Sequence, residues 1–441
     1  QLSNEDFYIE TDHDLTDEHA ANIADYVNRL VEDGEIHQTT ANYLLSDISR
    51  TAQFYLLPKI HKNPQNPPGR PIVSGNSSPT EKISQLVDTV IKPFVPKIKS
   101  YVRDTPDFLE KLSKLGPLPE GTILVSLDVS SLYTNIPHRE GLRATAETLV
   151  SNRDPNHKPS NAVVINLLRK VLELNNFDFN DKHYLQIGGT AMGTRVAPSY
   201  ANIFMDYFER RFVYTYRLQP SLWLRYIDDI FMLWPHGQQE LIRFLDYLNA
   251  CHDTIKFTCE HSTEQVNFLD LIVMLIDNKI TTTLYTKPTD SHSYLRYDSD
   301  HAKSVCDGIP FSQFLRIKRN CSEFEDFLYH SILLSYYFLC RFYPTTLVLD
   351  AFIKANAIER STLLKPQAKT TTDDSRLFCL TTHNPLDPNL QRMIQKHGPK
   401  LERHASTRPL VKYQIIYGKR RNENLSDMLV RAKLPSLIST T

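Results

Sequence analysis

Apolar and polar positions in the first part of the chain follow patterns that predict helices and one hairpin. In "DEHAANIADYVNRLVEDGEI" the apolar residues recur at helical spacing and Gly34 ends the pattern, so residues 1 to about 50 are expected to form acidic amphipathic helices. Residues 54–75, "FYLLPKIHKNPQNPPGRPIVSG", have the pattern of a hairpin with a basic tip rich in proline and glycine. Residues 80–115 are expected to be helical again.

The rest of the chain mixes β-branched segments with helical ones. "GTILVSLDVSSLYTNIP" (121–137) predicts a strand and a turn, and helices are expected over 139–151 and 160–176. "HYLQIGGTAMGTRVAPSYANIFMDYFERRF" predicts a strand, a glycine-rich turn and a long helix, and "WLRYIDDIFMLW" predicts a strand–turn–strand. A helix follows, then the strands "IKFTCE", "NFLDLIVMLIDNKI" and "TTTLYTK", and a helical region from about 309 to 360. This order predicts an α+β fold, with helices on one face of a sheet.

Length and composition agree with a large packed core. The 441 residues are enough for two or three domains, and 41% of them are hydrophobic. The six cysteines form no C-x-x-C pair, which favours free intracellular thiols. No apolar run approaches the roughly 20 residues of a membrane helix, so no membrane association is expected. The chain begins with Gln1 rather than Met, which favours a fragment of a longer protein.

Charge is segregated along the chain, although the formal net charge is only −1. Residues 1–50 hold twelve acidic residues against Arg29 and Arg50, whereas residues 395–433 hold ten basic residues against three acidic ones. A basic tail of this kind favours binding to a polyanion. A solvated basic surface, or a clamp formed with the acidic first 50 residues, would give the same charge pattern.

Three aspartates are expected at neighbouring strand ends. Asp128 would end one strand, and Asp228 and Asp229 would occupy the tight turn of the hairpin beside it. Clustered carboxylates repel one another unless a cation neutralises them, and hard divalent ions such as Mg²⁺ prefer oxygen ligands. Two such ions could activate a hydroxyl and stabilise a leaving oxygen in phosphoryl transfer. Taken alone, an Asp-Asp turn is also a common structural feature.

The order of motifs over about 55–322 resembles a reverse transcriptase. Within that class the chain is most similar to Penelope-like retroelement enzymes, which are relatives of telomerase reverse transcriptase. The resemblance rests on seven ordered stretches: "FYLLPKIHK…RPIVSG", "SLDVSSLYTNIP", "GTAMGTRVAPSYANIFM", "YIDDIFMLW", "NFLDLIV", "LYTKPTDSHSYL" and "IPFSQFLRIKRNCS".

The resemblance implies roles for residues of the aspartate cluster. Asp128, Asp228 and Asp229 match the family's catalytic, metal-binding triad, with Asp228 as a direct ligand and Asp229 bound through water or to one ion only. Val129 would offer its backbone carbonyl to a metal. Tyr133 matches the aromatic gate under the sugar of the incoming nucleotide, which would favour deoxynucleotides. An ordinary core aromatic is the alternative for Tyr133.

The hairpin at 54–75 would supply the cations that hold the triphosphate. Arg70 and Lys59 match the family's nucleotide-binding residues, since Arg makes bidentate phosphate contacts and Lys supplies a point charge. Lys62 could replace Lys59, and either lysine could instead be a solvated loop charge. For the family's general-acid lysine the chain offers Lys256 at a shifted position, with Glu260 nearby, and this role stays open.

The glycine-rich stretch "GTAMGTRVAPSYAN" matches the motif that supports the templating base and the nucleotide. Gly193, Ala197 and Ser199 are small enough to let the substrates approach closely. Met192 stands where many reverse transcriptases have Gln, so no side-chain hydrogen bond is expected there. Met192 and Gly193 are therefore candidate nucleotide-binding residues.

The later motifs imply contacts to nucleic acid. "LYTKPTDSHSYL" (284–295) lies where the family has its primer grip, and the helices from Ile309 would form a thumb. An amphipathic core helix with a charged outer face is the alternative for the thumb segment. The candidate nucleic-acid-binding residues of the thumb and the basic tail are Arg316, Lys318, Arg319, Lys419, Arg420 and Arg421.

Together these features predict a right-hand polymerase that adds deoxynucleotides to a primer 3′-hydroxyl. The implied cofactor is two Mg²⁺ ions, with Mn²⁺ as an alternative, and the implied partners are an RNA template, a DNA primer and dNTP, in the nucleus. The chain would be the polymerase portion alone, without the family's GIY-YIG endonuclease. The alternatives are a domesticated non-catalytic nucleic-acid-binding descendant and an RNA-dependent RNA polymerase.

The expected domains are an acidic N-terminal helical extension (1–53), fingers (54–120), a palm (121–300) with finger insertions at about 138–185, a helical thumb (301–364), and a linker with a basic C-terminal tail (365–441).

Overall fold

A computed structural model of the chain shows two compact units. One unit comprises Gln1–Phe108 and Leu115–Ile280, and the other comprises Leu109–Lys114 and Thr281–Thr441. The structure describes residues 5–45, 49–60, 65–365, 376–382 and 414–420, together with residues 2, 63, 392–393, 396–397 and 400.

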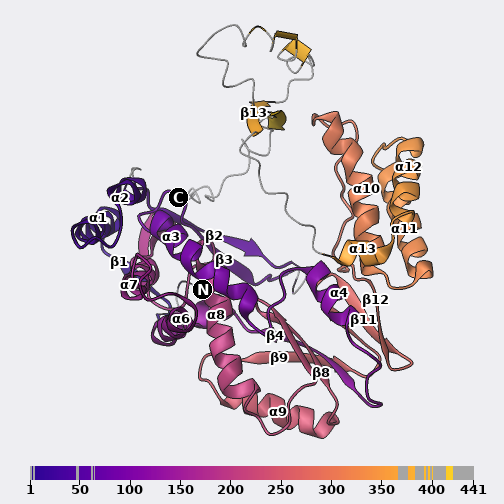
Figure 1. Cartoon of the computed structure of the whole chain (residues 1–441), viewed down its shortest axis with the longest axis horizontal. Helices are drawn as coiled ribbons and strands as arrows, with labels where there is room; N and C mark the ends of the chain where they lie inside the picture. The colour runs from indigo at the N-terminus through magenta and orange to yellow at the C-terminus, as the bar shows by residue number, and fades with distance from the viewer. Residues whose placement is uncertain are drawn as a thin grey trace, which may run out of the picture. The chain divides into compact units, whose positions relative to one another are not determined.

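The first unit contains a five-stranded sheet in the order β1-β6-β5-β2-β3, of which β1, β2 and β3 are labelled in Figure 1. The hairpin expected at 54–75 is confirmed, since β2 and β3 pair antiparallel from Gln53↔Ser74 to Pro58↔Gly69. Two strands of this sheet were not expected, because β1 and β5 are only four residues long and are fixed by distant partners rather than by a local pattern. The strands are β1 (Tyr8–Thr11), β2 (Ala52–Pro58), β3 (Gly69–Ser74), β5 (Asn176–Phe179) and β6 (Lys182–Gln186).

The second sheet of this unit has the order β7-β8-β4-β9 and carries the aspartates. β4 is central and pairs antiparallel with β8 on one side and with β9 on the other. The strand–turn–strand expected in "WLRYIDDIFMLW" is confirmed by the antiparallel pair β7 and β8. The strands are β4 (Ile123–Val129), β7 (Leu222–Tyr226), β8 (Asp229–Trp234) and β9 (Phe257–Ser262).

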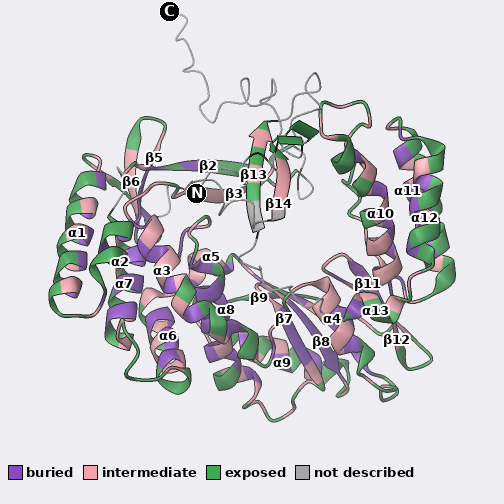
Figure 2. Ribbon diagram, turned by 45° about the horizontal axis from the view of Figure 1, so that its top comes forward, coloured by how far each residue is buried: buried purple, intermediate pink, exposed green. Residues whose placement is uncertain are grey.

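Most residues of β7 and β8 are buried (purple in Figure 2), as are most residues of β4, whereas β9 is largely exposed. On one face Trp234 of β8 stacks on Phe244 at 5.0 Å between ring centroids. On the other face Phe231 meets Phe108 at 5.1 Å and Phe268 at 5.7 Å. β8 is therefore a rigid strand, buried from Ile230 to its end, that holds Asp229 and the turn before it in a fixed position.

Helices surround these sheets. The helices expected over 139–151 and 160–176 are confirmed by α6 and α7, and the expected helical region 80–115 is divided by a 3-10 segment that contains two prolines. The helical segments are α1 (Thr16–Glu32), α2 (Gln38–Leu44), α3 (Glu81–Ile91), η1 (Lys92–Lys97), α4 (Thr105–Ser113, which crosses the boundary of the units), α5 (Leu132–Asn135), α6 (His138–Asn152), α7 (Asn161–Glu173), α8 (Ala197–Phe208), η2 (Glu209–Val213) and α9 (Gln238–Ala250).

The structure contains a three-stranded sheet, β10-β11-β12, where the sequence predicted fewer strands. The stretch "NFLDLIVMLIDNKI" was expected to be a single strand, but it contains parts of three strands and two turns. The second turn is made by Asp277 and Asn278, both with positive φ, as in the tight turns of hairpins. The strands are β10 (Gln265–Phe268), β11 (Leu271–Ile276) and β12 (Lys279–Leu284).

The second unit is mainly helical. Its helical region begins at Lys303, earlier than expected, and Phe314, Phe327 and Phe338 lie in its core. The described part of the C-terminal tail contains a parallel pair of strands, which the sequence did not predict. The elements are α10 (Lys303–Asn320), α11 (Phe324–Leu339), α12 (Thr345–Asn356), α13 (Arg360–Leu364), β13 (Arg376–Thr382) and β14 (Gln414–Arg420). All six cysteines are free thiols, and no helix in the described ranges has the length and apolar character needed to cross a bilayer.

Candidate active site

The strand pairing brings the aspartate motifs together. Asp128 at the end of β4 lies opposite Asp229, the first residue of β8. The backbone N–H of Val129 donates a hydrogen bond to the carbonyl of Asp228 at 3.0 Å, which fixes the hairpin turn beside β4. The turn itself consists of Ile227 and Asp228, so Asp229 belongs to the strand rather than to the turn where it was expected.

The turn holds a strained residue. Ile227 has a φ of 56°, a left-handed conformation that a β-branched residue rarely adopts. The Arg225 guanidinium donates from Nη1 to the Ile227 carbonyl at 3.2 Å. Strain of this kind persists only where the surrounding structure fixes it, and it is concentrated at functional sites.

A buried ion pair lies behind the turn. Arg225 and Glu209 are both 0% exposed, and Arg225 Nε donates to Glu209 Oε1 at 2.6 Å. Glu209 also accepts hydrogen bonds from Trp223 Nε1 at 2.9 Å and from Ser100 Oγ at 2.5 Å. Arg225 Nη1 donates in addition to Asn202 Oδ1 at 2.8 Å. These hydrogen bonds connect the β7–β8 hairpin to η2, to α8 and to the segment before α4.

The Asp228 carboxyl lies in a half-buried environment. Burial raises the pKa of Asp228 above its ordinary value, and the neighbouring charge of Asp128 raises it further, whereas Arg70 and Lys59 lower it. Asp128 itself is exposed at the end of β4. Two neighbouring carboxylates, one of which has a raised pKa, offer hard oxygen donors that suit a divalent cation.

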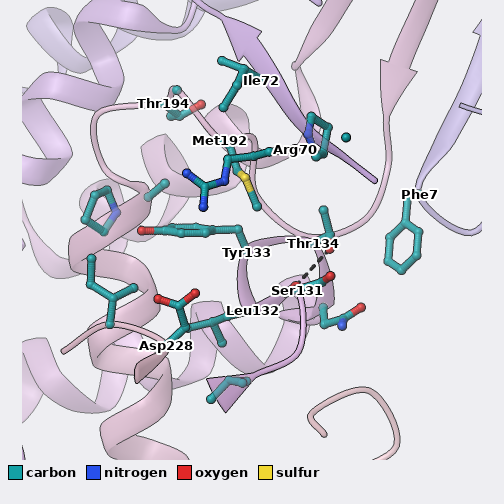
Figure 3. A pocket seen from close by; sticks show the side chains of 18 of the residues that line it. Phe7, Arg70, Ile72, Ser131, Leu132, Tyr133, Thr134, Met192, Thr194 and Asp228 are labelled. Atoms are coloured by element: carbon teal, nitrogen blue, oxygen red, sulfur yellow. Dashed lines mark hydrogen bonds between the residues drawn. The ribbon is translucent and has the colours of Figure 1, made fainter. Parts of the chain in front are cut away.

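The β2–β3 hairpin brings both predicted cations to this site. Arg70 lies on β3, and Lys59 follows β2, where its backbone N–H donates to the Pro68 carbonyl at 2.8 Å. In Figure 3 the ring of Tyr133 lies between the Arg70 guanidinium and the Asp228 carboxylate. Burial raises the pKa of Tyr133 to about 12, and the charge of Asp228 contributes to the rise, so the hydroxyl stays neutral.

The glycine-rich loop joins the hairpin to the helix that carries Tyr133. The Thr190 N–H donates to the Tyr133 carbonyl at 2.7 Å, and the Val73 N–H donates to the Met192 carbonyl at 2.9 Å. Gly193 has a φ of 128°, and a Cβ there would lie 2.3 Å from the Val73 carbonyl oxygen. Only glycine fits this close contact between the loop and β3.

These residues line one cavity of about 760 Å³ in the first unit. Ser199, which was expected to allow close approach, is instead buried and donates to Asp88 at 2.5 Å. The predicted residues that line the cavity are Lys59, Arg70, Asp128, Val129, Tyr133, Met192, Gly193, Ala197 and Asp228. Lining residues that the sequence did not indicate include Phe7, Tyr8, Ile72, Thr134, Asn135 and Arg195.

The other predicted residues lie elsewhere. Lys256 donates to the Asn249 and His252 carbonyls at 2.6 and 2.8 Å and so caps the C-terminus of α9, and Glu260 lies on β9. Lys62 and Arg421 fall outside the described residues. The second unit holds Arg316, Lys318 and Arg319 on α10, and Lys419 and Arg420 on β14.

One further cluster in the described residues has the ligand types of a metal site. Asp14, Asp178 and His183 lie together near the five-stranded sheet, and all three are half-buried. The Asp14 carboxylate accepts hydrogen bonds from Thr16, Thr51 and Asn176, and His183 contacts Asp178 at 2.7 Å. Because protein donors already occupy its oxygens, this cluster is a structural network.

The fold is that of the right-hand polymerases. A telomerase from Candida albicans, in complex with a fragment of telomeric RNA, has this fold at a TM-score of 0.50 and 10% identity, over 81% of this chain and 70% of that one. A C-terminally truncated Candida tropicalis telomerase matches at a TM-score of 0.40 and 13% identity, over 52% of this chain and 54% of that one. The chain thus spans about half the length of the Candida tropicalis protein. The RNA-dependent RNA polymerase of a human picobirnavirus matches at a TM-score of 0.46 and 11% identity, over 71% of this chain and 63% of that one.

Two family models match parts of the chain. Residues 60–267 match the model of the reverse transcriptase (RNA-dependent DNA polymerase) family, so this part of the chain is similar to a reverse transcriptase domain. Residues 293–353 match the animal helix-turn-helix domain, which here covers α10, α11 and most of α12. No curated protein matches the chain.

Proposed function

We propose that the chain is the polymerase portion of a Penelope-like retroelement, which copies RNA by adding deoxynucleotides to a primer 3′-hydroxyl. The observation that carries this proposal is a single cavity lined by Asp128, Asp228, Lys59 and Arg70, in which the Tyr133 ring lies between Arg70 and Asp228 (Figure 3). The cations would hold a triphosphate, and the carboxylates would stand where its α-phosphate reacts.

Reverse transcriptases use divalent metal ions, and the donor set fits them. Asp128, Asp228 and the Val129 carbonyl would hold the ions, with Asp229 as a more distant or water-mediated ligand. Two Mg²⁺, or Mn²⁺ in their place, would supply charge stabilisation to the phosphoryl transfer when bound. The raised pKa of Asp228 supports this assignment, because a bound cation would offset the unfavourable burial of its charge.

The chain's own residues would position the substrates. Arg70 would make bidentate contacts to the phosphates, and Lys59 would add a point charge. The neutral Tyr133 ring would lie under the sugar, where its bulk would oppose a 2′-hydroxyl. Met192 and Gly193 would form the floor beneath the nucleotide, held in place by the hydrogen bond from Val73.

The remaining parts of the proposal concern domains and partners. Fingers, palm and thumb would divide near residues 120, 300 and 364, with the N-terminal extension before residue 54. The RNA template and DNA primer would contact Arg316, Lys318 and Arg319 and the basic tail. A retroelement enzyme of this kind would act in the nucleus.

Primer extension tests the proposed function directly. Purified chain, an RNA or DNA template, a DNA primer and either dNTPs or NTPs should give extension with dNTPs on the RNA template in Mg²⁺. Extension with NTPs instead would support the alternative of an RNA-dependent RNA polymerase. Template–primer binding without extension in Mg²⁺ or Mn²⁺ would support a non-catalytic descendant, although the chain retains all three aspartates.

A further inference from the structure

The N-terminal segment borders the candidate nucleotide cavity, which the sequence did not predict. Phe7 and Tyr8 line the cavity together with Asp128, Arg70 and Tyr133. β1 pairs antiparallel with β6 from Tyr8↔Gln186 onward, and the Ile187 N–H donates to the Phe7 carbonyl at 2.9 Å. The segment thus extends the five-stranded sheet up to the point where the glycine-rich loop begins.

Phe7 and its neighbour Tyr8 have different environments. Tyr8 is 5% exposed and packs edge-on against Phe177 at 5.8 Å, so it anchors β1 in the core. Phe7 is half-buried, and part of its ring faces the cavity. In the view of Figure 3, Phe7 lies beyond Ser131 and Thr134 from the Arg70 and Tyr133 side chains.

The loop holds the Phe7 ring in place. A Cβ at Gly188 would lie 2.9 Å from Phe7 Cδ1 and 2.9 Å from the Asp6 carbonyl oxygen. At the next position, a Cβ at Gly189 would lie 2.4 Å from the Thr134 carbonyl oxygen. The two glycines let the loop pass between the N-terminal segment and α5, so the Phe7 ring and α5 flank the same loop.

We propose that Phe7 is a nucleotide-pocket residue: its ring forms the wall of the cavity opposite the Arg70 side and sets the affinity for the incoming deoxynucleoside triphosphate. This inference rests on the proposed function. The charged residues of the cavity would bind the phosphates but would offer the base and sugar little apolar surface, whereas a half-buried aromatic ring gains contact and loses water when a nucleotide covers it. Phe7 shares one cavity with the carboxylates and with Tyr133, which favours the nucleotide over the template strand as its ligand.

Kinetics of single-nucleotide addition test this role. Phe7→Ala should raise the KM for dNTP about 10-fold, a change within the range measured for aromatic contacts to bases. The kcat should stay within about 2-fold of the wild-type value. The Kd for template–primer should not change. Phe7→Tyr, which keeps the ring, should restore the wild-type KM. The matched control is Ile9→Ala on the same strand, because Ile9 is 39% exposed and does not line the cavity.

A second variant moves the ring without changing it. Gly188→Ala should displace Phe7 and raise the KM in the same direction, because its Cβ has no room beside the ring. Gly116→Ala is the control, since a Cβ at Gly116 meets nothing within 4 Å. Melting temperatures of all variants show whether β1 stays paired.

The outcomes separate this inference from the proposed function. An unchanged KM in Phe7→Ala, an equal rise in Ile9→Ala, or a change confined to the Kd for template–primer would each overturn the role of Phe7. If the wild-type chain extends no primer, the proposed function fails. Direct titration of dNTP in Ca²⁺, which requires no turnover, still tests whether Phe7→Ala weakens nucleotide binding about 10-fold.

Discussion

The Asp228 carboxyl combines two properties that conflict in a protein without bound metal. It is half-buried beside Asp128, and burial raises its pKa, yet its proposed role requires the ionised form. A divalent cation would resolve the conflict by favouring ionisation, which is why this aspartate is expected to be the most sensitive to substitution.

Asp228→Asn should reduce primer extension by a factor of about 100–1,000, since several kcal/mol of charge stabilisation would be lost. Template–primer binding should stay near the wild-type level, because the substitution alters neither Lys59 and Arg70 of the β2–β3 hairpin nor any residue of the second unit. Asp277→Asn is the control, as Asp277 is an exposed turn aspartate whose positive φ suits asparagine equally well. Comparable extension by Asp228→Asn would show that the assignment of the triad is wrong.

Tyr133→Val should raise the use of ribonucleotides relative to deoxynucleotides by about 10-fold or more, because the smaller side chain leaves space for a 2′-hydroxyl. Competition between dGTP and GTP in single-nucleotide addition measures the ratio. Tyr216→Val, which removes a half-buried tyrosine outside the cavity, should leave the ratio unchanged. If Tyr133→Val behaves like this control, the sugar gate lies at another residue.

The β7–β8 hairpin shows how an element fixes a residue. Arg225 on β7 is hydrogen-bonded both to Glu209 and to the carbonyl of Ile227, so the strained turn is held from behind by a buried charge pair. Such a pair contributes little net stability, but removal of one partner leaves the other charge buried and uncompensated.

Arg225→Met should destabilise the protein by about 3–5 kcal/mol, since it leaves Glu209 buried and unpaired. The double variant Arg225→Met with Glu209→Gln should regain much of that stability, but its kcat should stay about 10–100-fold low because Ile227 is no longer held. Denaturant unfolding and single-nucleotide addition measure the two effects. Arg243→Met, which removes an exposed ion pair, should change stability by less than about 0.5 kcal/mol.

If kcat recovered together with stability in the double variant, the network would be structural only. Recovery of neither would mean that the buried pair is required for folding of the hairpin itself.

The elements differ in how far the sequence specified them. The β7–β8 hairpin and α6 were predictable, because long periodic or β-branched runs determine them locally. β1 was not, since "YIET" is short and becomes a strand only by pairing with β6. The same reason explains why Asp128, Asp228, Arg70 and Tyr133 were found from motifs, whereas Phe7 was not. The proposed role of Phe7 depends on the pairing of β1 with β6, which no local pattern in the sequence predicts.

At the scale of the whole molecule, the basic tail is a part proposed to bind nucleic acid outside the cavity. Lys419 and Arg420 are exposed on β14, which pairs with β13, and most of the segment 395–433 lies outside the described residues. Because deletion of the tail would also remove the partner of β13, neutralising substitutions are a cleaner test than truncation.

A triple variant should weaken template–primer binding; it carries Lys419→Gln, Arg420→Gln and Arg421→Gln. Each lost phosphate contact should flatten the slope of log affinity against log salt by about 0.7–0.9, so the three together should flatten it by up to about 2–3. Single-nucleotide addition at saturating primer should survive, since the cavity is untouched. An unchanged slope with a lower melting temperature would support the alternative in which the tail clamps the acidic first 50 residues.

The central position of β4 determines at which point of protein synthesis its four-stranded sheet can be completed. β4 pairs with β8 and β9, and the ribosome synthesises both of these strands after β4. In the same way, β1 can pair only after β6 has been synthesised. Long-range pairings of this kind form slowly, and an apolar strand without partners invites association with other chains. A nascent chain that stalls before β9 (Phe257–Ser262) therefore leaves the edge of β4 that pairs with β9 without its partner.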